Sequence, residues 1–309
     1  MNKKQLGILL LLVSVLMWGP GPVITKLALK EVPQWSLAFL RAVISTAIVF
    51  ILFYKKGYFK VEKKDLPLLY TAGALGSVFN LAFFFLGIQR TSAINAQTIF
   101  TVSPILTAVL AAILLKEKIK PVQFAGIIIG LAGAMVVALR DVFETGRFDN
   151  GSLLGNFLIL MAAVSWVGYI LISKKLSRRY SPITITSFSF LASLFAFTPL
   201  AIIENTQNLS WIGSLGFNGI FGILYQGVFS SVVAFLAYQA GLKLTNAFTA
   251  GVILYLNPIV TTLIAVPVLK EKITAPFLVG AMLIIIGSLI ATQFEVIQNH
   301  ARKKSRKTA

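Results

Sequence analysis

The residues that could bind a small molecule lie inside long apolar stretches of the chain. Arg41 is the one charged residue well within such a stretch; its guanidinium could anchor a carboxylate or phosphate, or form a structural bridge to helix carbonyls, and we favour the bridge. Amide side chains there must meet another helix or water, because lipid offers no partner. The candidate binding residues are Trp18, Arg41, Asn80, Phe84, Asn95, Gln97, Trp166, Tyr169, Tyr225, Gln226, Tyr238, Gln239, Tyr255 and Asn257.

Two of the aromatic candidates share their spacing to a lysine. Trp18 precedes Lys26 by eight residues, and Trp166 precedes Lys174 by the same distance. Tryptophan rings on opposite sides of one cavity could stack on an aromatic substrate or bind a quaternary ammonium by cation–π contact. Packing, or anchoring at the membrane interface, would explain such aromatic residues equally well.

The apolar stretches lack the groups that enzymes use. All ten acidic residues fall at the ends of these stretches or between them, His300 is the single histidine, and the chain has no cysteine. No acid–base pair, activated nucleophile or metal site can therefore be assembled there. We expect no enzyme activity, no cofactor and no metal. The same absence predicts a facilitator or exchanger without a carboxylate proton relay, while a polytopic enzyme or scaffold is the alternative from another class.

The composition is that of an integral membrane protein. Hydrophobic residues make up 57% of the 309 residues, charged residues 12%, and the mean hydropathy is +0.85. About 20 apolar residues are needed to span a bilayer as a helix. The chain contains ten such apolar runs, separated by short polar breaks. The ten predicted spans are 6–29, 34–54, 66–89, 92–115, 121–139, 153–173, 182–203, 211–242, 246–269 and 274–297.

The strong positive charge of +18 is distributed between the spans. Because the cations do not gather on one folded face, we expect no nucleic-acid partner. Most of the 28 basic residues fall on one side of a ten-span arrangement. Because basic residues are enriched on the cytoplasmic side, this predicts that both termini lie in the cytoplasm. We expect the protein in the inner (plasma) membrane of the cell. The basic tail, residues 299–309, should bind anionic lipids. The spans are compatible with a monomer or a homodimer.

The sequence contains an internal repeat. Residues 91–119 align without a gap to residues 245–273 at a constant offset of 154, from Thr91 to Thr245. The matched pairs include Ala93/Ala247, Pro104/Pro258, Thr107/Thr261, Gly87/Gly241, Gly126/Gly280 and Gly133/Gly287. Each half then holds five helices, residues 1–145 and 146–298, and an odd number inverts the second half relative to the first. Such inverted repeats are typical of carriers that work by alternating access.

Prolines interrupt the spans at places where a hinge would be useful. Pro104 and Pro258 occupy matched positions in the fourth and ninth spans, and paired interruptions point to a binding site. Pro20 and Pro22 interrupt the first span and release the carbonyls of Leu16 and Trp18. We therefore predict that the first span is kinked or unwound at residues 18 to 22 and widens a cavity beside Trp18.

Matched glutamates follow the fourth and ninth spans. Glu117 and Glu271 each stand in the string LKEKI, on opposite faces of the predicted bundle. A gating salt bridge is one interpretation. Capping of the following helix is the other, because exposed ion pairs usually contribute only about 0 to 1 kcal/mol.

These patterns together resemble one family. WG followed by Lys26, the string FLR at 39–41, TSAINA at 91–96, Pro104 and LKEKI at 115–119 are similar to EamA-type members of the drug/metabolite transporter superfamily. The resemblance implies a 5+5 inverted bundle, with four helices of each half around a central cavity and the fifth and tenth outside it. It also implies small polar metabolites as substrates, often moved outward. The chain departs from the family in the sequence PGP after Trp18.

The resemblance leaves the substrate open. We rank amino-acid or related metabolite efflux first, because Arg41 and the amides could hold a zwitterion. Transport of a choline-like quaternary amine comes second, because the tryptophans and tyrosines resemble an aromatic cage.

Overall fold

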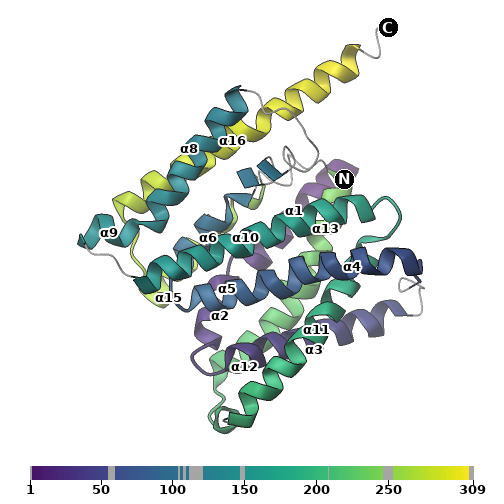
Figure 1. Cartoon of the computed structure of the whole chain (residues 1–309), viewed down its shortest axis with the longest axis vertical. Coiled ribbons are helices and arrows are strands. Elements are labelled where there is room, and N and C mark those ends of the chain that lie inside the picture. Colours follow the sequence, from purple (N-terminus) through teal and green to yellow (C-terminus); the bar gives the residue numbers. More distant parts are fainter. Residues whose placement is uncertain are drawn as a thin grey trace.

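The structure is a computed structural model, described for residues 2–54, 60–103, 105–106, 109–110, 121–146, 150–207, 209–245 and 253–305. Every regular element among these residues is a helix (Figure 1). Seven helical segments in this part of the chain are long and apolar enough to cross a membrane. They are Lys3–Ala28, Gln34–Leu52, Lys63–Ile88, Pro121–Ala138, Gly151–Ser173, Pro182–Thr206 and Phe217–Leu244. The prediction of an all-helical polytopic membrane protein is therefore confirmed.

The other three predicted spans are described only in part. The fourth contributes α6, Ala93–Phe100, while Pro104 and Glu117 lie outside the described residues. The ninth contributes α15, Asn257–Leu269, and the tenth contributes α16, whose apolar portion is Ala275–Ile290. As crossings of a membrane, these three stay predictions.

The helices begin where the local sequence favours a start. Asn2 and Gln5 form a capping box at the first helix, and Ser92 accepts a hydrogen bond from the N–H of Asn95 at α6. Several other helices carry a proline in their first turn, where its missing N–H costs nothing. The remaining bounds are α1 Lys3–Trp18, α2 Gly21–Ala28, α3 Gln34–Phe53, η2 Lys63–Asp65, α4 Leu66–Gly73, η3 Ala74–Phe79, α5 Asn80–Ile88, α8 Pro121–Ala138, α9 Arg140–Thr145, α10 Asn150–Leu176, α11 Pro182–Gln207, η4 Ser210–Ile212, α12 Phe217–Leu224, η5 Tyr225–Val233, α13 Ala234–Leu244 and α16 Ala275–Ser305.

The first span is interrupted at the predicted place. Helix α1 ends at Trp18 and α2 begins at Gly21, because two prolines in this segment cannot donate backbone hydrogen bonds. Neighbouring helices supply donors instead: the hydroxyl of Tyr225 donates to the Met17 carbonyl at 2.9 Å, and that of Thr261 to the Gly19 carbonyl at 2.6 Å. The sequence had pointed to the carbonyls of Leu16 and Trp18. The carbonyls that accept these bonds are those of the next residues along the chain, Met17 and Gly19.

Two spans contain π-helical segments. These are η3, in the span that ends with α5, and η5, in the span that ends with α13. A π-helical turn widens the helix and is frequent at functional sites. In η5 it brings three polar side chains, Gln226, Ser230 and Ser231, into the bundle interior at 2%, 6% and 1% exposure.

Helices α8 and α16 lie side by side at one edge of the bundle (Figure 1). Glycines let the two backbones approach closely, as small residues commonly do between membrane helices. A Cβ added to Gly133 would lie 2.6 Å from the Gly280 carbonyl oxygen, and one added to Gly287 would lie 2.6 Å from that of Gly126.

Two further helix pairs make the same kind of contact. A Cβ on Gly241 would lie 2.9 Å from the carbonyl oxygen of Gly7, which joins α13 to α1. A Cβ on Gly87 would lie 2.9 Å from the carbonyl oxygen of Gly155, which joins α5 to α10. Backbone packing through glycine therefore recurs at three contacts between distant segments.

Carboxylates cap helices that are distant in sequence. Glu31 accepts hydrogen bonds from the N–H groups of Gly216 and Gly219 at the start of α12, at 3.0 and 2.7 Å. Glu204 accepts from the N–H of Ser36 at 2.7 Å, near the start of α3. The backbone hydrogen bond from Gly219 is the main reason that the pKa of Glu31 is lowered; burial opposes it, and Asn218 adds to it.

Replacing Gly133 by alanine should destabilise the α8–α16 pair. The new methyl group would meet backbone atoms of α16, which cannot move aside cheaply. We expect a loss of about 1 to 3 kcal/mol, measured as a lower thermal midpoint in detergent micelles. Gly21→Ala is the matched control, because no atom lies within 4 Å of the added Cβ. An equal midpoint for both variants would contradict the close packing.

Acid should remove the stabilisation that Glu31 supplies. A carboxylate with a lowered folded-state pKa stabilises fully above its ordinary value of 4.5, and that contribution is lost as pH falls through the folded-state value. Glu31→Gln should therefore lower the thermal midpoint at about pH 7, and lower it less at about pH 3. Glu62→Gln, which breaks only an exposed pair with Lys64, should change little at either pH. A pH-independent difference for Glu31→Gln would contradict this account.

Candidate functional site

Trp18 and Trp166 meet in an aromatic cluster at the interruption of the first span. Their ring centroids are 5.8 Å apart in an edge-to-face arrangement, which aromatic pairs favour. Trp18 also contacts Phe235 and Tyr238 of α13 at 5.5 and 5.4 Å, and its Nε1 donates to the Ser230 carbonyl at 2.9 Å. Aromatic rings thus pack around Trp18, and the widened cavity beside it stays a prediction.

The buried amides join helices to one another. Asn80 donates to the Ala162 carbonyl at 2.8 Å, which links α5 to α10. Gln239 donates to the hydroxyl of Tyr169 at 3.2 Å, which links α13 to α10. Each of these bonds satisfies an amide group that lipid could not.

Arg41 lies in a network of neutral partners. Its Nε donates to the hydroxyl of Ser231 at 2.7 Å, and its Nη1 donates to the Gln226 carbonyl oxygen at 3.3 Å. Gln226 donates in turn to the hydroxyl of Thr25 at 2.5 Å. Arg41 therefore bridges α3, η5 and α2. The ion pairs formed by the described residues do not include it.

The candidate residues of α15 lie at a buried surface. Asn257 is 5% exposed, and its Oδ1 has no hydrogen-bond partner among the described residues. One turn later on α15, Thr261 bonds the interrupted first span. Pro258 follows Asn257 in the first turn of α15, so the ninth span is interrupted where predicted.

The remaining candidates are buried or pack against the core. Gln97 and Tyr255 are 9% and 8% exposed, and Phe84 packs against the apolar core formed by α6 and its neighbours. Tyr225 bonds the first span, as described above.

Lys26 and Glu271 hold three segments together at one end of the bundle. Lys26 donates to the Thr91 carbonyl at 2.7 Å and lies 3.5 Å from a Glu271 carboxylate oxygen. Glu271 accepts from the N–H groups of Ala93 and Ile94, at 2.7 and 3.0 Å, at the start of α6. The helix dipole favours a negative charge at that position. We call this arrangement the Lys26–Glu271 latch.

The latch matches one sequence expectation and adds a partner that was missed. Glu271 forms an ion pair with Lys26, but the helix that it caps is α6 and not α16, the helix that follows it; a gating role stays a prediction. Its counterpart Glu117 lies outside the described residues, so the symmetric gate stays a prediction. The sequence analysis noted Lys26 only for its spacing to Trp18 and did not name it as a functional residue. The equal spacing of Lys174 to Trp166 was the signal that could have identified it.

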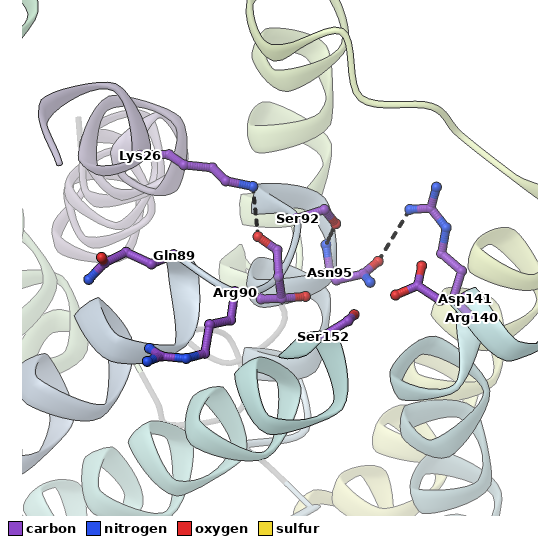
Figure 2. Close-up of a pocket in the computed structure, with 9 residues that line it drawn as sticks. Lys26, Gln89, Arg90, Ser92, Asn95, Arg140, Asp141 and Ser152 are labelled. Atoms are coloured by element: carbon purple, nitrogen blue, oxygen red, sulfur yellow. Dashed lines mark hydrogen bonds between the residues drawn. The ribbon is translucent and has the colours of Figure 1, made fainter. Parts of the chain in front are cut away.

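A polar pocket of about 240 Å³ lies beside the latch (Figure 2). Three of its lining residues are cations, and one, Asp141, is an acid. Arg140 donates to Glu144 at 2.5 Å and to the Lys272 carbonyl at 3.1 Å, so its position is fixed by α9 and by the segment before α16. The lining residues are Lys26, Gln89, Arg90, Thr91, Ser92, Asn95, Arg140, Asp141 and Ser152.

The sequence pattern did not single out most of this pocket. Of its residues, only Asn95 had been named as a candidate, and the Arg140 Nη1 reaches its side-chain oxygen at 3.4 Å. Arg90 and Asp141 look like ordinary charges at the ends of spans. Among the residues that the structure describes, no cluster of three or more His, Cys, Asp or Glu side chains could bind a metal ion.

Comparison with known proteins connects this structure with membrane transport. The model of the EamA-like transporter family matches residues 5–139 and, separately, residues 153–293. Similar proteins include an uncharacterized transporter of Clostridium kluyveri, 29% identical over 75% of this chain and 73% of that protein. An uncharacterized transporter of Archaeoglobus fulgidus is 25% identical over 92% and 96% of the two chains. The uncharacterized transporter YetK of Bacillus subtilis is 26% identical over 93% and 87%.

A solved structure shares the fold. One crystal structure superposes with a TM-score of 0.64 and covers 93% of this chain and 96% of its own. Sequence identity is 21%, so the likeness concerns the arrangement of helices alone.

Removing the charge of Glu271 should loosen the latch. Hydrogen bonds to a charged group contribute about 1.5 to 3 kcal/mol, so Glu271→Gln should raise the population of opened molecules about tenfold or more. The chain has no cysteine, so Ile99→Cys on α6, at a position 2% exposed, can serve as a reporter. We expect its maleimide labelling to accelerate in Glu271→Gln. Glu204→Gln, which alters the cap of a different helix, is the control, and equal acceleration in both variants would contradict a local latch.

Proposed function

Because this chain belongs to the EamA-like transporter family, we propose that it exports amino acids or related small zwitterionic metabolites by alternating access, rather than acting as a polytopic enzyme or scaffold. The observation that carries the proposal is the polar pocket beside the Lys26–Glu271 latch. The pocket opens to solvent on one side of a closed contact, and the aromatic cluster lies further inside the bundle. This is the arrangement expected when one gate of a carrier is closed.

The charges around the pocket suit a zwitterion. Lys26, Arg90 and Arg140 could attract a carboxylate, and Asp141 could attract an ammonium group. The volume of about 240 Å³ is below the range typical of drug-sized ligands, which favours a smaller molecule. Further inside, the unpartnered Oδ1 of Asn257 could accept a hydrogen bond from the same ammonium.

Alternating access would follow from two inverted halves, residues 1–145 and 146–298, with five spans each. The glycine contacts support this arrangement, because the repeat relates them to one another. Moving Gly126 and Gly133 by the repeat offset gives Gly280 and Gly287, so the contact between Gly133 and Gly280 is equivalent to that between Gly287 and Gly126. Exchanging the conformations of two such halves would close one gate and open the other.

The charge distribution favours an orientation and a mechanism. With both termini and the basic tail, residues 299–309, in the cytoplasm and the protein in the plasma membrane, the Lys26–Glu271 latch would face the outside. The tail would bind anionic lipids. The spans lack a carboxylate or histidine relay, so we propose a facilitator or exchanger, acting as a monomer or homodimer, in which Pro20, Pro22, Pro104 and Pro258 allow the helices to bend.

A choline-like quaternary amine is the second candidate substrate. The observation that favours it is the cluster of Trp18, Trp166, Phe235 and Tyr238, whose faces would become available when the rings separate. Aromatic faces bind quaternary ammonium groups by cation–π contact.

Counterflow in liposomes should distinguish these substrates. Purified protein, loaded inside with an unlabelled compound, is tested for uptake of labelled amino acids and of labelled choline. We expect saturable exchange of at least one amino acid, weakened about tenfold or more by Arg90→Gln because a charged contact is lost. Lys243→Gln, at the far end of the bundle, is the control. Choline exchange without an amino-acid signal would contradict the first-ranked substrate.

Collapse of the proton gradient should leave exchange unchanged. The expectation follows from the absence of a membrane-embedded acid or histidine relay. It is measured by adding a protonophore during counterflow and by imposing opposite pH gradients. Accumulation that requires the gradient would contradict the proposed facilitator or exchanger.

A further inference from the structure

Arg41 carries a charge that its protein partners do not neutralise. It lies within α3, inside a span, and it donates hydrogen bonds to a serine hydroxyl and a glutamine amide. None of the ion pairs formed by the described residues includes it. A cation in a membrane interior is costly unless a counter-charge accompanies it.

A small pocket borders Arg41 between three helical segments. Its polar lining residues, besides Arg41, are Ser45 of α3, Ser77 of η3 and Ser193 of α11. Ala38, Ala42, Leu81 and Phe190 complete the lining. A guanidinium beside hydroxyl groups offers hydrogen-bond donors to an anion from several directions.

The size of the pocket limits what it can hold. Its volume is about 10 Å³, which corresponds to one water-sized probe. A single-atom anion such as chloride is only slightly larger than a water molecule. A carboxylate or phosphate has three or more heavy atoms, and would enter only if the helices moved apart.

We propose that this pocket binds one halide ion, chloride under ordinary conditions, as the counter-ion of Arg41. The guanidinium supplies charge and N–H donors, and the hydroxyls of Ser77 and Ser193 supply further donors, while the Ser45 hydroxyl donates to the Ala42 carbonyl. The ion joins α3, η3 and α11, so its binding stabilises the packed bundle. This inference stands apart from the choice of exported substrate, because it concerns a different pocket from the one beside the latch.

Halide binding should be visible as ligand-dependent stability. The thermal midpoint of the purified protein in detergent is measured while sodium chloride or sodium bromide replaces sodium gluconate at constant ionic strength. We expect a saturable rise with either halide, because gluconate is too large for the pocket. Equilibrium binding of radioactive chloride should reach one ion per chain.

Variants locate the site. Ser193→Val should weaken the halide dependence about tenfold or more, because a hydrogen bond to an ion is lost and the new methyl groups enter the pocket. Arg41→Gln should abolish it. Ser187→Val is the matched control on the same helix, since its hydroxyl bonds the Ile183 carbonyl and does not line the pocket. Radioactive chloride binding to Ser187→Val should equal that of the unaltered protein.

Three results would overturn the proposal. No difference between halide and gluconate, with no bound chloride, would mean that the pocket holds water. Equal loss of chloride binding in Ser193→Val and Ser187→Val would place the ion elsewhere. One-for-one displacement of chloride by a transported amino acid would assign Arg41 to the substrate carboxylate instead of to a counter-ion.

Discussion

Every polar group inside this bundle must find its partner in protein or in trapped solvent, because hydrocarbon supplies none. The double-proline segment of the first span is where this constraint is most severe, since two backbone donors are missing within three residues. The hydroxyls of Tyr225 and Thr261 supply donors in their place, to the carbonyls of Met17 and Gly19. The interruption therefore ties the first span to the eighth and ninth. Any movement of the first span relative to these neighbours must exchange those hydrogen bonds for others.

The same constraint explains why polar contacts connect segments far apart in sequence. Glu31, Glu204 and Glu271 each accept backbone N–H groups at or near the start of a helix in another part of the chain. The charge of each carboxylate is stabilised by the helix dipole, and each helix start gains acceptors that it otherwise lacks. Such links are strong but can be replaced by water at the ends of the bundle. The aromatic cluster around Trp18 and Trp166 is held mainly by ring contacts, which water does not replace.

Much of the architecture could be predicted because it leaves a periodic record in the sequence. Apolar runs indicated the helices, and equal spacings in the two halves indicated that Trp18 and Trp166 lie close together. The sequence carries no such pattern for which side chain contacts which partner. Lys26 bonds Glu271 and the Thr91 carbonyl only because three helices end at the same place, and Arg140 reaches the Lys272 carbonyl for the same reason. The contacts of Trp18 with Phe235 and Tyr238 were likewise missed, because the repeat does not relate α13 to the first span.

Arg41 shows how the same constraint acts on a charge. Its protein partners, the Ser231 hydroxyl and the Gln226 amide, accept its hydrogen bonds but carry no negative charge. Two opposite unit charges about 4 Å apart in a medium of effective dielectric 20 attract each other by about 4 kcal/mol. A counter-ion in the pocket beside Arg41 would supply that attraction where α3, η3 and α11 already meet. The charge of Arg41 would then be balanced inside the bundle, apart from the polar pocket beside the latch.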